Sequence, residues 1–350
     1  MSSFPEQEPG HPKDESQYHV NEPAVSRPEN DLPSPLELQS GPADETPASA
    51  FDPDQAWKTE LSPPGPHPIE PPLFQLQPLP PVRIPHLGHL FFLLFALLPM
   101  GLLATGLLLA LALHERLYGV STAQHAVANI HYILGSEAIL YLVTFVAALF
   151  IFPVFWHKGF FAGLQWNAAT AFRLRWRLAS AAMICFLLAV LNGELLPGPT
   201  NTPIEKVFRA PGAAWLLFAF GVTFAPFFEE TLFRGFLLPS LCTAYDWLVE
   251  RFTGKPLLPL GPKGHPQWSL PAMVVGSIAT SIPFAWMHAE QTGYAFGPLL
   301  LLVGVSIVLC AVRLATRSLA ASVVVHACYN FLLFSLMLVA SSGFRHLDKM

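Results

Sequence analysis

Long apolar runs separated by short polar segments fill most of residues 86–350. About 20 helical residues cross the hydrocarbon core of a bilayer, which is about 30 Å thick, and seven of the runs are near that length. The pattern therefore predicts an all-α fold, a polytopic transmembrane helical bundle of seven or eight spans. The predicted spans cover residues 90–113, 132–156, 178–197, 213–238, 271–292, 296–313 and 319–340.

One segment between the fourth and fifth runs allows two interpretations. From Leu241 to Phe252, apolar residues recur at helical spacing against charged residues. This is the pattern of a helix that lies in the membrane interface. The same residues are equally consistent with a fourth span that continues past Pro239.

Composition separates an amino-terminal tail from this helical region. Residues 1–85 hold 20 of the 35 prolines, with 14 acidic and 4 basic residues, a net charge of −10. Such a segment has too little apolar surface to offset its ordering entropy, so we expect a disordered tail. The helical membrane domain is then expected to span residues 86–345, with a net charge of +5 over 86–350.

The basic residues lie in loops and indicate orientation. The loop 157–177 carries Lys158, Arg173, Arg175 and Arg177. Loops rich in Lys and Arg stay on the cytoplasmic side, so two preceding spans would leave the tail cytoplasmic as well. We expect an integral protein of a bacterial inner membrane, in contact with membrane lipids. No basic-aromatic pattern points to nucleic acid as a partner.

Four cysteines are widely separated, and no Cys-x-x-Cys pair occurs. They are Cys185, Cys242, Cys310 and Cys328. Cysteines of this kind behave as small hydrophobic residues, and we expect them to be buried rather than to form disulfides or a metal site.

A cluster of charges interrupts the fourth apolar run. Glu229, Glu230 and Arg234 lie inside residues 225–238, where a charge costs at least about 2.5 kcal/mol at bilayer depth. Glu230 and Arg234 are spaced as a favourable helical ion pair. This leaves Glu229 available as a base or a ligand. The alternative is that all three residues form one structural ion cluster.

Two later helices carry further polar residues. Phe284 and His288 share a helix face, although a lone histidine near a helix end is also typical of an interfacial residue. His326 and Asn330 also share a face and could donate hydrogen bonds to an oxyanion. A buried hydrogen bond between two helices is the alternative for that pair. Arg317, near the start of the same helix, is expected to extend towards the headgroups.

Together these motifs resemble those of the CAAX-protease and bacteriocin-processing (CPBP, Abi) family of intramembrane proteases. That family is marked by Glu-Glu-x-x-x-Arg, then Phe-x-x-x-His, then a basic residue nine positions before His-x-x-x-Asn. The resemblance covers about residues 213–340. The matching positions, in order, are Glu229, Glu230 and Arg234, then Phe284 and His288, then Arg317, His326 and Asn330.

The resemblance implies an intramembrane endopeptidase. Glu229 would act with His288 to activate a water, and His326 with Asn330 would stabilise the oxyanion. Glu230 would complete the catalytic set, and with Arg234 it would hold the helix and tune the site. Arg234, Phe284 and Arg317 would have a structural or tuning role. The substrate would be a peptide or a lipidated protein at the membrane. The alternative is a non-proteolytic relative, such as a bacteriocin-immunity or scaffold protein.

The sequence is compatible with a metal and with a metal-free mechanism. Glu229, His288 and His326 could furnish a zinc site with an open water position, as in a metalloprotease. However, the chain has no His-Glu-x-x-His, and a metal-free glutamate mechanism fits equally well.

The predicted topology raises one difficulty. His288 would lie towards the far leaflet and His326 in the near half of the last span. Their convergence on Glu229 requires a tilted or shifted helix, for which Gly276, Pro283 and Gly293 are the natural adjusting points.

Overall fold

The structure is a computed structural model that describes residues 83–196, 202–208, 212–261 and 264–344. These residues belong to the second of the two units into which the chain divides, Gln75–Met350. The predicted disordered tail, apart from residues 83–85, lies outside the described residues.

All regular secondary structure in the described residues is helical, and seven helices are long and apolar enough to cross a membrane. The predicted all-α bundle is therefore confirmed. The spans are α1 to α2 (Leu87–Glu115), α4 (Ile130–Trp156), α7 (Arg175–Leu195), α9 to α11 (Ala213–Thr253), α12 (Leu270–Met287), α13 (Phe296–Thr316) and α14 (Leu319–Ala340). Shorter elements connect them: the 3-10 turn η2 (Leu117–Gly119), α3 (Ala123–Ala128), α5 (Phe160–Gly163), α6 (Ala168–Arg173) and α8 (Pro203–Phe208).

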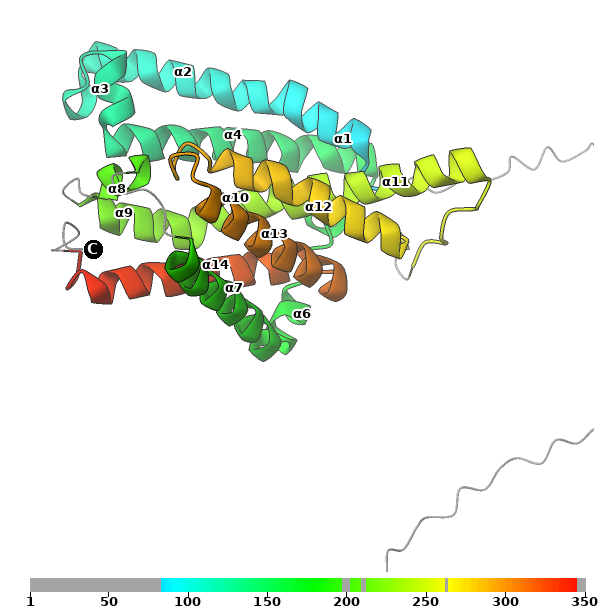
Figure 1. Cartoon of the computed structure of the whole chain (residues 1–350). Coiled ribbons are helices and arrows are strands. Elements are labelled where there is room, and N and C mark those ends of the chain that lie inside the picture. Colours follow the sequence, from blue (N-terminus) through cyan, green and yellow to red (C-terminus); the bar gives the residue numbers. More distant parts are fainter. Residues whose placement is uncertain (1–82, 197–201, 209–211, 262–263, 345–350) are drawn as a thin grey trace, which may run out of the picture. The chain divides into compact units, whose positions relative to one another are not determined.

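The fourth span is a single continuous helix that runs to Thr253, as Figure 1 shows for α10 and α11. The interpretation of Leu241–Phe252 as a continuation past Pro239 is therefore the correct one. The helix ends at Gly254, whose positive φ of 69° suits the left-handed conformation of a helix terminus. Asp246, on the buried side of α11, accepts hydrogen bonds from the backbone N–H and the hydroxyl of Ser269, which caps α12.

Two of the spans contain π-helical segments, and proline explains where they lie. The segments are η1 (Leu93–Leu97) in the first span, and η3 (Phe220–Phe224) and η4 (Thr231–Leu237) in the fourth. Each is followed, two residues after its end, by a proline: Pro99, Pro226 and Pro239. A proline inside a helix lacks the N–H donor and clashes with the carbonyl four residues earlier. A wider turn relieves that clash, and α2, α10 and α11 (Leu238–Thr253) then restart with the proline as second residue.

The spans pack so that the fourth lies among the others. In Figure 1, α2 runs alongside α4, and α12 lies between α11 and α13; residue contacts confirm both arrangements. The last helix, α14, contacts α7, α13 and α10 (Ala225–Glu230). Gly276 permits the close approach of α12 to α11, because a Cβ atom there would lie 2.6 Å from Sγ of Cys242.

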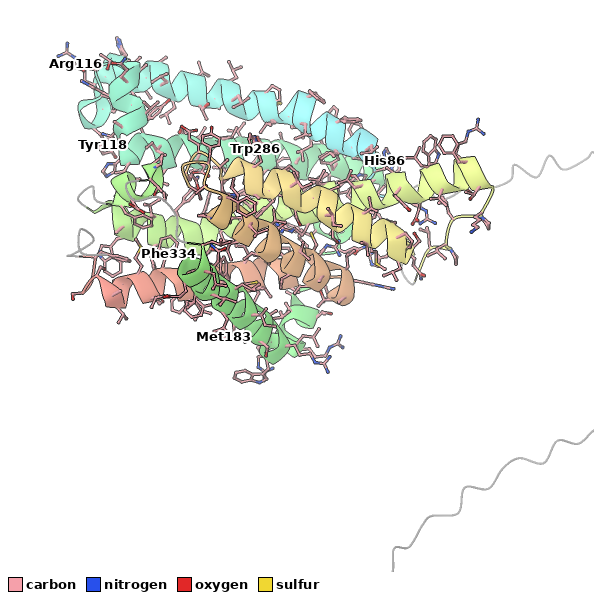
Figure 2. All side chains as sticks on the ribbon, in the orientation of Figure 1. His86, Arg116, Tyr118, Met183, Trp286 and Phe334 are labelled. Atoms are coloured by element: carbon pink, nitrogen blue, oxygen red, sulfur yellow. The ribbon has the colours of Figure 1, made fainter. Side chains whose placement is uncertain are left out.

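The outer surface of the bundle is apolar. Large hydrophobic side chains are exposed along most of the spans, including Met183 of α7 and Trp286 of α12 (Figure 2). Of the four cysteines, three are buried as expected, but Cys328 is exposed on α14. The expectation of burial was wrong there because Cys328 lies on a different face of the helix from His326, which points inwards.

Candidate active site

Glu229 and Glu230 are the last two residues of α10, directly between the two π-helical segments of the fourth span. Both are buried: Glu229 is 7% exposed and Glu230 is fully buried. The wider turns on either side give this part of the helix an irregular backbone at the level of the charged residues. Such π-bulges occur often at functional sites.

Glu230 forms the predicted ion pair. Arg234 donates from Nη1 to Oε1 of Glu230 at 2.8 Å, and both side chains are fully buried. From Nη2, Arg234 also donates to the carbonyl and hydroxyl oxygens of Ser306 on α13. Its guanidinium lies 4.5 Å from the centre of the Phe284 ring. The charge of Glu230 is thus compensated within the protein.

His326 contacts both glutamates. Nδ1 of His326 lies 3.0 Å from Oε1 of Glu230, and Nε2 lies 3.8 Å from Oε2 of Glu229. Because the Glu230 carboxylate paired with Arg234 can only accept, the Nδ1–H of His326 is the donor. Glu230 therefore orients the imidazole, and its Nε2 is directed towards Glu229.

The predicted run 271–292 placed His288 inside a span, but in the structure His288 lies just after the end of one. The helix α12 ends at Met287, and His288 is the residue that caps it. The turn that follows reverses the chain through Gly293, which has a φ of 63°. Nδ1 of His288 lies 2.9 Å from the carbonyl oxygen of Phe284, so the Nδ1–H donates and Nε2 is left free to accept a proton.

Phe284 brings the two histidines together. Its ring centre lies 5.1 Å from that of His288 and 5.9 Å from that of His326. The side chain is buried against Phe233 of η4 as well. The two histidines pack against the same aromatic ring, and both line one cavity together with Glu229, so the expected difficulty in bringing them to Glu229 is absent.

Asn330 lies one turn beyond His326 and bonds to the fourth span. Its amide donates to the carbonyl oxygen of Gly221 at 2.7 Å. In η3 the N–H of Ala225 bonds to Phe220, so the next carbonyl, that of Gly221, would need the N–H of residue 226. That residue is proline. The amide of Asn330 supplies the missing donor, and its second N–H remains for another partner.

Arg317 does not approach these residues. It is exposed, and it follows the end of α13 with a positive φ of 50°. The structural or tuning role of Arg317 stays a prediction, whereas its expected position outside the protein interior agrees with the structure. The buried basic residue of α13 is instead Arg313, which is 2% exposed.

The candidate residues line a cavity of about 250 Å³. It is bounded by α4, α8, η3, α10, α13 and α14, together with the turn after α12. Its polar lining consists of Glu137, Glu229, His288, Gln291, His326, Tyr329 and Asn330. The structure thus brings together Glu229, His288, His326 and Asn330 around the cavity, which Phe284 also lines. Glu230 and Arg234 lie outside the lining and bond to each other, and Glu230 also bonds to His326.

Glu137 of α4 was missed by the sequence analysis. It lines the same cavity and accepts a hydrogen bond from the hydroxyl of Tyr141 at 2.9 Å. Glu137 is the only charged residue in the apolar run 132–156. The rule that drew attention to Glu229 and Glu230 could therefore have found it.

A second, smaller cavity of about 90 Å³ is also lined by Glu229. Its lining is almost wholly apolar and comes from the first span, α4 and η4. Glu229 borders both cavities, and Tyr141 closes one side of the apolar one.

The residues do not present a ready metal centre. In the described part of the chain, no group of three His, Cys, Asp or Glu side chains is placed to hold a metal ion. His326 and His288 each have Nδ1 bonded to protein, to Glu230 and to Phe284 respectively, and keep Nε2 available, which is also the arrangement usual in metal-ligating histidines.

The fold and the site define a class: a polytopic helical membrane protein with a buried acid and two histidines around a cavity. Within it, residues 211–332 match the sequence model of the Rce1-like family, described as type II CAAX prenyl endopeptidase Rce1-like. The resemblance to the CAAX-protease family is thereby confirmed for that segment, which holds both glutamates, both histidines and Asn330. A search of curated proteins and a search of solved structures found no match to the chain.

Proposed function

We propose that the protein is an intramembrane endopeptidase that hydrolyses a peptide bond of a membrane-associated, lipidated substrate. One observation carries this proposal: Glu229, next to a glutamate whose charge is already compensated, borders a cavity shared with His288 and His326. The match to a family of CAAX prenyl endopeptidases supports the same reaction class.

In the proposed reaction, Glu229 is the general base. Its carboxylate takes a proton from a water as the water oxygen attacks the peptide carbonyl carbon. The free Nε2 of His288 faces the same cavity and can accept and return a proton. When the tetrahedral intermediate breaks its C–N bond, the proton passes to the leaving amine nitrogen. Positioned acid–base groups of this kind accelerate a reaction by about 10²–10⁴-fold.

His326 and Asn330 are the proposed oxyanion donors. With Nδ1 bonded to the Glu230 carboxylate, a His326 that also carries a proton on Nε2 can donate towards the cavity. The second amide N–H of Asn330 is the other donor, since the first is bonded to Gly221. Donors fixed before the reaction stabilise a developing negative charge without reorganisation.

The apolar cavity next to Glu229 supports a lipidated substrate. A peptide bond at Glu229 would have one polar cavity and one apolar cavity beside it. The apolar one can accept a hydrocarbon side chain or part of a lipid chain, and burying it is favourable by about 25 cal/mol per Å².

We place the protein in a bacterial inner membrane with its amino-terminal tail in the cytoplasm. The basic residues that support this orientation, Lys158, Arg173, Arg175 and Arg177, are all exposed between α4 and the first turn of α7. A reporter fused to the amino terminus should be accessible only from the cytoplasmic side.

The decisive experiment uses purified protein in liposomes with paired peptides, identical except for a prenyl group on one cysteine. Wild type should release a fragment, identified by mass spectrometry, and should prefer the prenylated peptide. Glu229→Gln, which keeps the shape of the side chain, should abolish release. Glu290→Gln, at an exposed glutamate in the turn after α12, is the matched control and should cleave as wild type does.

Two outcomes would contradict the proposal. Equal cleavage by wild type and Glu229→Gln would assign the activity to another residue or to a contaminant. No cleavage by either, in protein that remains folded, would favour the non-proteolytic alternative of an immunity or scaffold protein.

A further inference from the structure

The π-helical segment η4 leaves one carbonyl without a donor from its own helix. At the end of η4, the N–H of Leu238 bonds to the carbonyl of Phe233, five residues earlier. In that register the carbonyl of Arg234 would accept from residue 239. That residue is Pro239, which has no N–H. A buried carbonyl without a partner is costly, so another donor is needed.

Arg313 of α13 supplies that donor. Its Nε–H donates to the carbonyl oxygen of Arg234 at 3.2 Å. Its two other nitrogens donate to Oε1 of Gln165 at 2.9 Å and to the carbonyl oxygen of Leu164 at 3.3 Å. All three acceptors are neutral oxygens, and no carboxylate among the described residues pairs with Arg313.

A buried guanidinium without a carboxylate is unfavourable for stability alone. An apolar residue at the same position would avoid the desolvation of the charge, so Arg313 requires another explanation. Its position provides one. Ser306, two turns earlier on the same face of α13, accepts from the Arg234 side chain, while Arg313 bonds to the Arg234 backbone. Two residues of α13 therefore bond to Arg234, one to its side chain and one to its backbone carbonyl.

A continuous series of side-chain contacts connects Arg234 to Glu229. Arg234 donates to Glu230, and Glu230 accepts from Nδ1 of His326. Nε2 of His326 then faces Glu229. A displacement of the Arg234 backbone would therefore move the groups that orient the imidazole.

We propose that Arg313 is a positioning residue of the candidate active site, which replaces the missing N–H of Pro239 and so fixes the Arg234–Glu230–His326 chain. The effect of Arg313 on catalysis rests on the proposed function. The structural bridge, by which we mean the hydrogen bond from Arg313 to the Arg234 carbonyl, does not. Arg313 itself touches neither the cavity nor the reacting atoms.

The test restores the missing donor. Arg313→Met removes the guanidinium, whereas Pro239→Ala adds a backbone N–H within reach of the Arg234 carbonyl. Arg313→Met alone should lower kcat by about tenfold to a hundredfold with KM nearly unchanged, because a misplacement of about 1 Å can cost that much. In the double variant, kcat should recover to within a few fold of the Pro239→Ala value. Pro226→Ala, at the other π-helical segment, is the matched control and should give no recovery.

Thermal unfolding of the same proteins separates this inference from the proposed function. Arg313→Met should lower the Tm less in the Pro239→Ala background than in wild type, whether or not any peptide is cleaved. If the two effects on Tm and on kcat are simply additive, the bridge is overturned. Arg313→Gln, which keeps an amide donor and is a milder change, provides the same comparison if Arg313→Met does not fold. Absence of cleavage by wild type would overturn only the proposed function.

Discussion

Two adjacent glutamates have opposite surroundings in this protein. The carboxylate of Glu230 accepts from Arg234 and His326, whereas Glu229 borders two cavities and lies 3.8 Å from Nε2 of His326. Removing one partner of a buried ion pair lowers stability because the other charge is left uncompensated, while a charge that faces a cavity is available for chemistry. Substitutions at the two positions should therefore affect different quantities.

The first prediction concerns that difference. Glu230→Gln leaves the buried Arg234 without its carboxylate, and breaking a buried ion pair costs about 3–5 kcal/mol. We expect a clearly lower Tm in detergent micelles. Glu229→Gln removes the proposed base, so kcat should fall by about 10²–10⁴-fold with the Tm close to that of wild type. Circular dichroism melting and peptide cleavage measure the two effects.

The control for both is Glu290→Gln, at a glutamate that is exposed. It should leave the Tm and kcat unchanged. Equal losses of Tm in the Glu229 and Glu230 variants would mean that the two carboxylates form one structural cluster, and the division of roles would be wrong.

At this scale the sequence is informative only over short distances. The pairing of Glu230 with Arg234 follows from helical spacing, and the structure contains it. The contact between Glu230 and His326 joins residues 96 positions apart, so no local pattern predicts it. Arg313 is buried and Arg317 is exposed because Arg313 lies on the face of α13 that packs against the bundle, whereas Arg317 follows the end of that helix. The spacing of a basic residue to a motif does not report this difference.

At the scale of the helix, two prolines leave two carbonyls to be satisfied by other spans. Pro226 cannot donate to the carbonyl of Gly221, which accepts from Asn330 instead. Pro239 likewise cannot donate to the carbonyl of Arg234, which accepts from Arg313. Asn330 therefore has a structural task in addition to its proposed catalytic one. The two tasks can be separated, because the first needs only a donor for the Gly221 carbonyl.

The second prediction makes that separation. Asn330→Leu should lower both the Tm and kcat. Adding Pro226→Ala supplies an N–H to the Gly221 carbonyl, so the Tm should recover towards that of Pro226→Ala. The kcat should stay about 10²–10³-fold low, which is the usual cost of removing one oxyanion donor. Melting curves and single-turnover cleavage measure the two quantities.

Pro239→Ala in the same Asn330→Leu background is the control and should not restore the Tm, because it adds an N–H at the wrong segment. Full recovery of kcat in the Asn330→Leu, Pro226→Ala protein would assign Asn330 a structural role only. The oxyanion assignment would then have to be abandoned.

The spans themselves follow closely from hydropathy. The first predicted run, 90–113, lies inside the observed Leu87–Glu115, and the last agrees at its end, Ala340. Hydropathy reports apolar length but not where a helix stops, so it placed His288 inside a span rather than in the turn after Met287. Proline marks a defect in a helix, but whether the helix kinks or widens depends on donors from other helices. Asn330 and Arg313 could be identified as those donors only from the fold.

At the scale of the whole molecule, the cavity extends beyond the segment that matches the family. Residues 211–332 supply the acid, the histidines and the asparagine, but α4 and α8 close the cavity with residues such as Glu137 and Ile204. The site is thus a property of the assembled bundle. Access for a substrate should depend on the free volume between these helices rather than on the motif residues alone.

The third prediction tests that volume with two leucines of α13. Leu302 lines the cavity, whereas Leu300 is exposed on another face of the same helix. Leu302→Trp should fill part of the 250 Å³ and lower kcat/KM by about tenfold or more, because the indole would occupy space that the substrate needs in order to reach the right geometry. Leu300→Trp adds the same bulk outside the cavity and should change kcat/KM by less than about twofold. Both are measured with the prenylated peptide, after melting curves show that each protein is folded. If Leu302→Trp cleaves as well as Leu300→Trp does, the substrate must reach Glu229 by another route, and the apolar cavity that Glu229 also lines would be the remaining candidate.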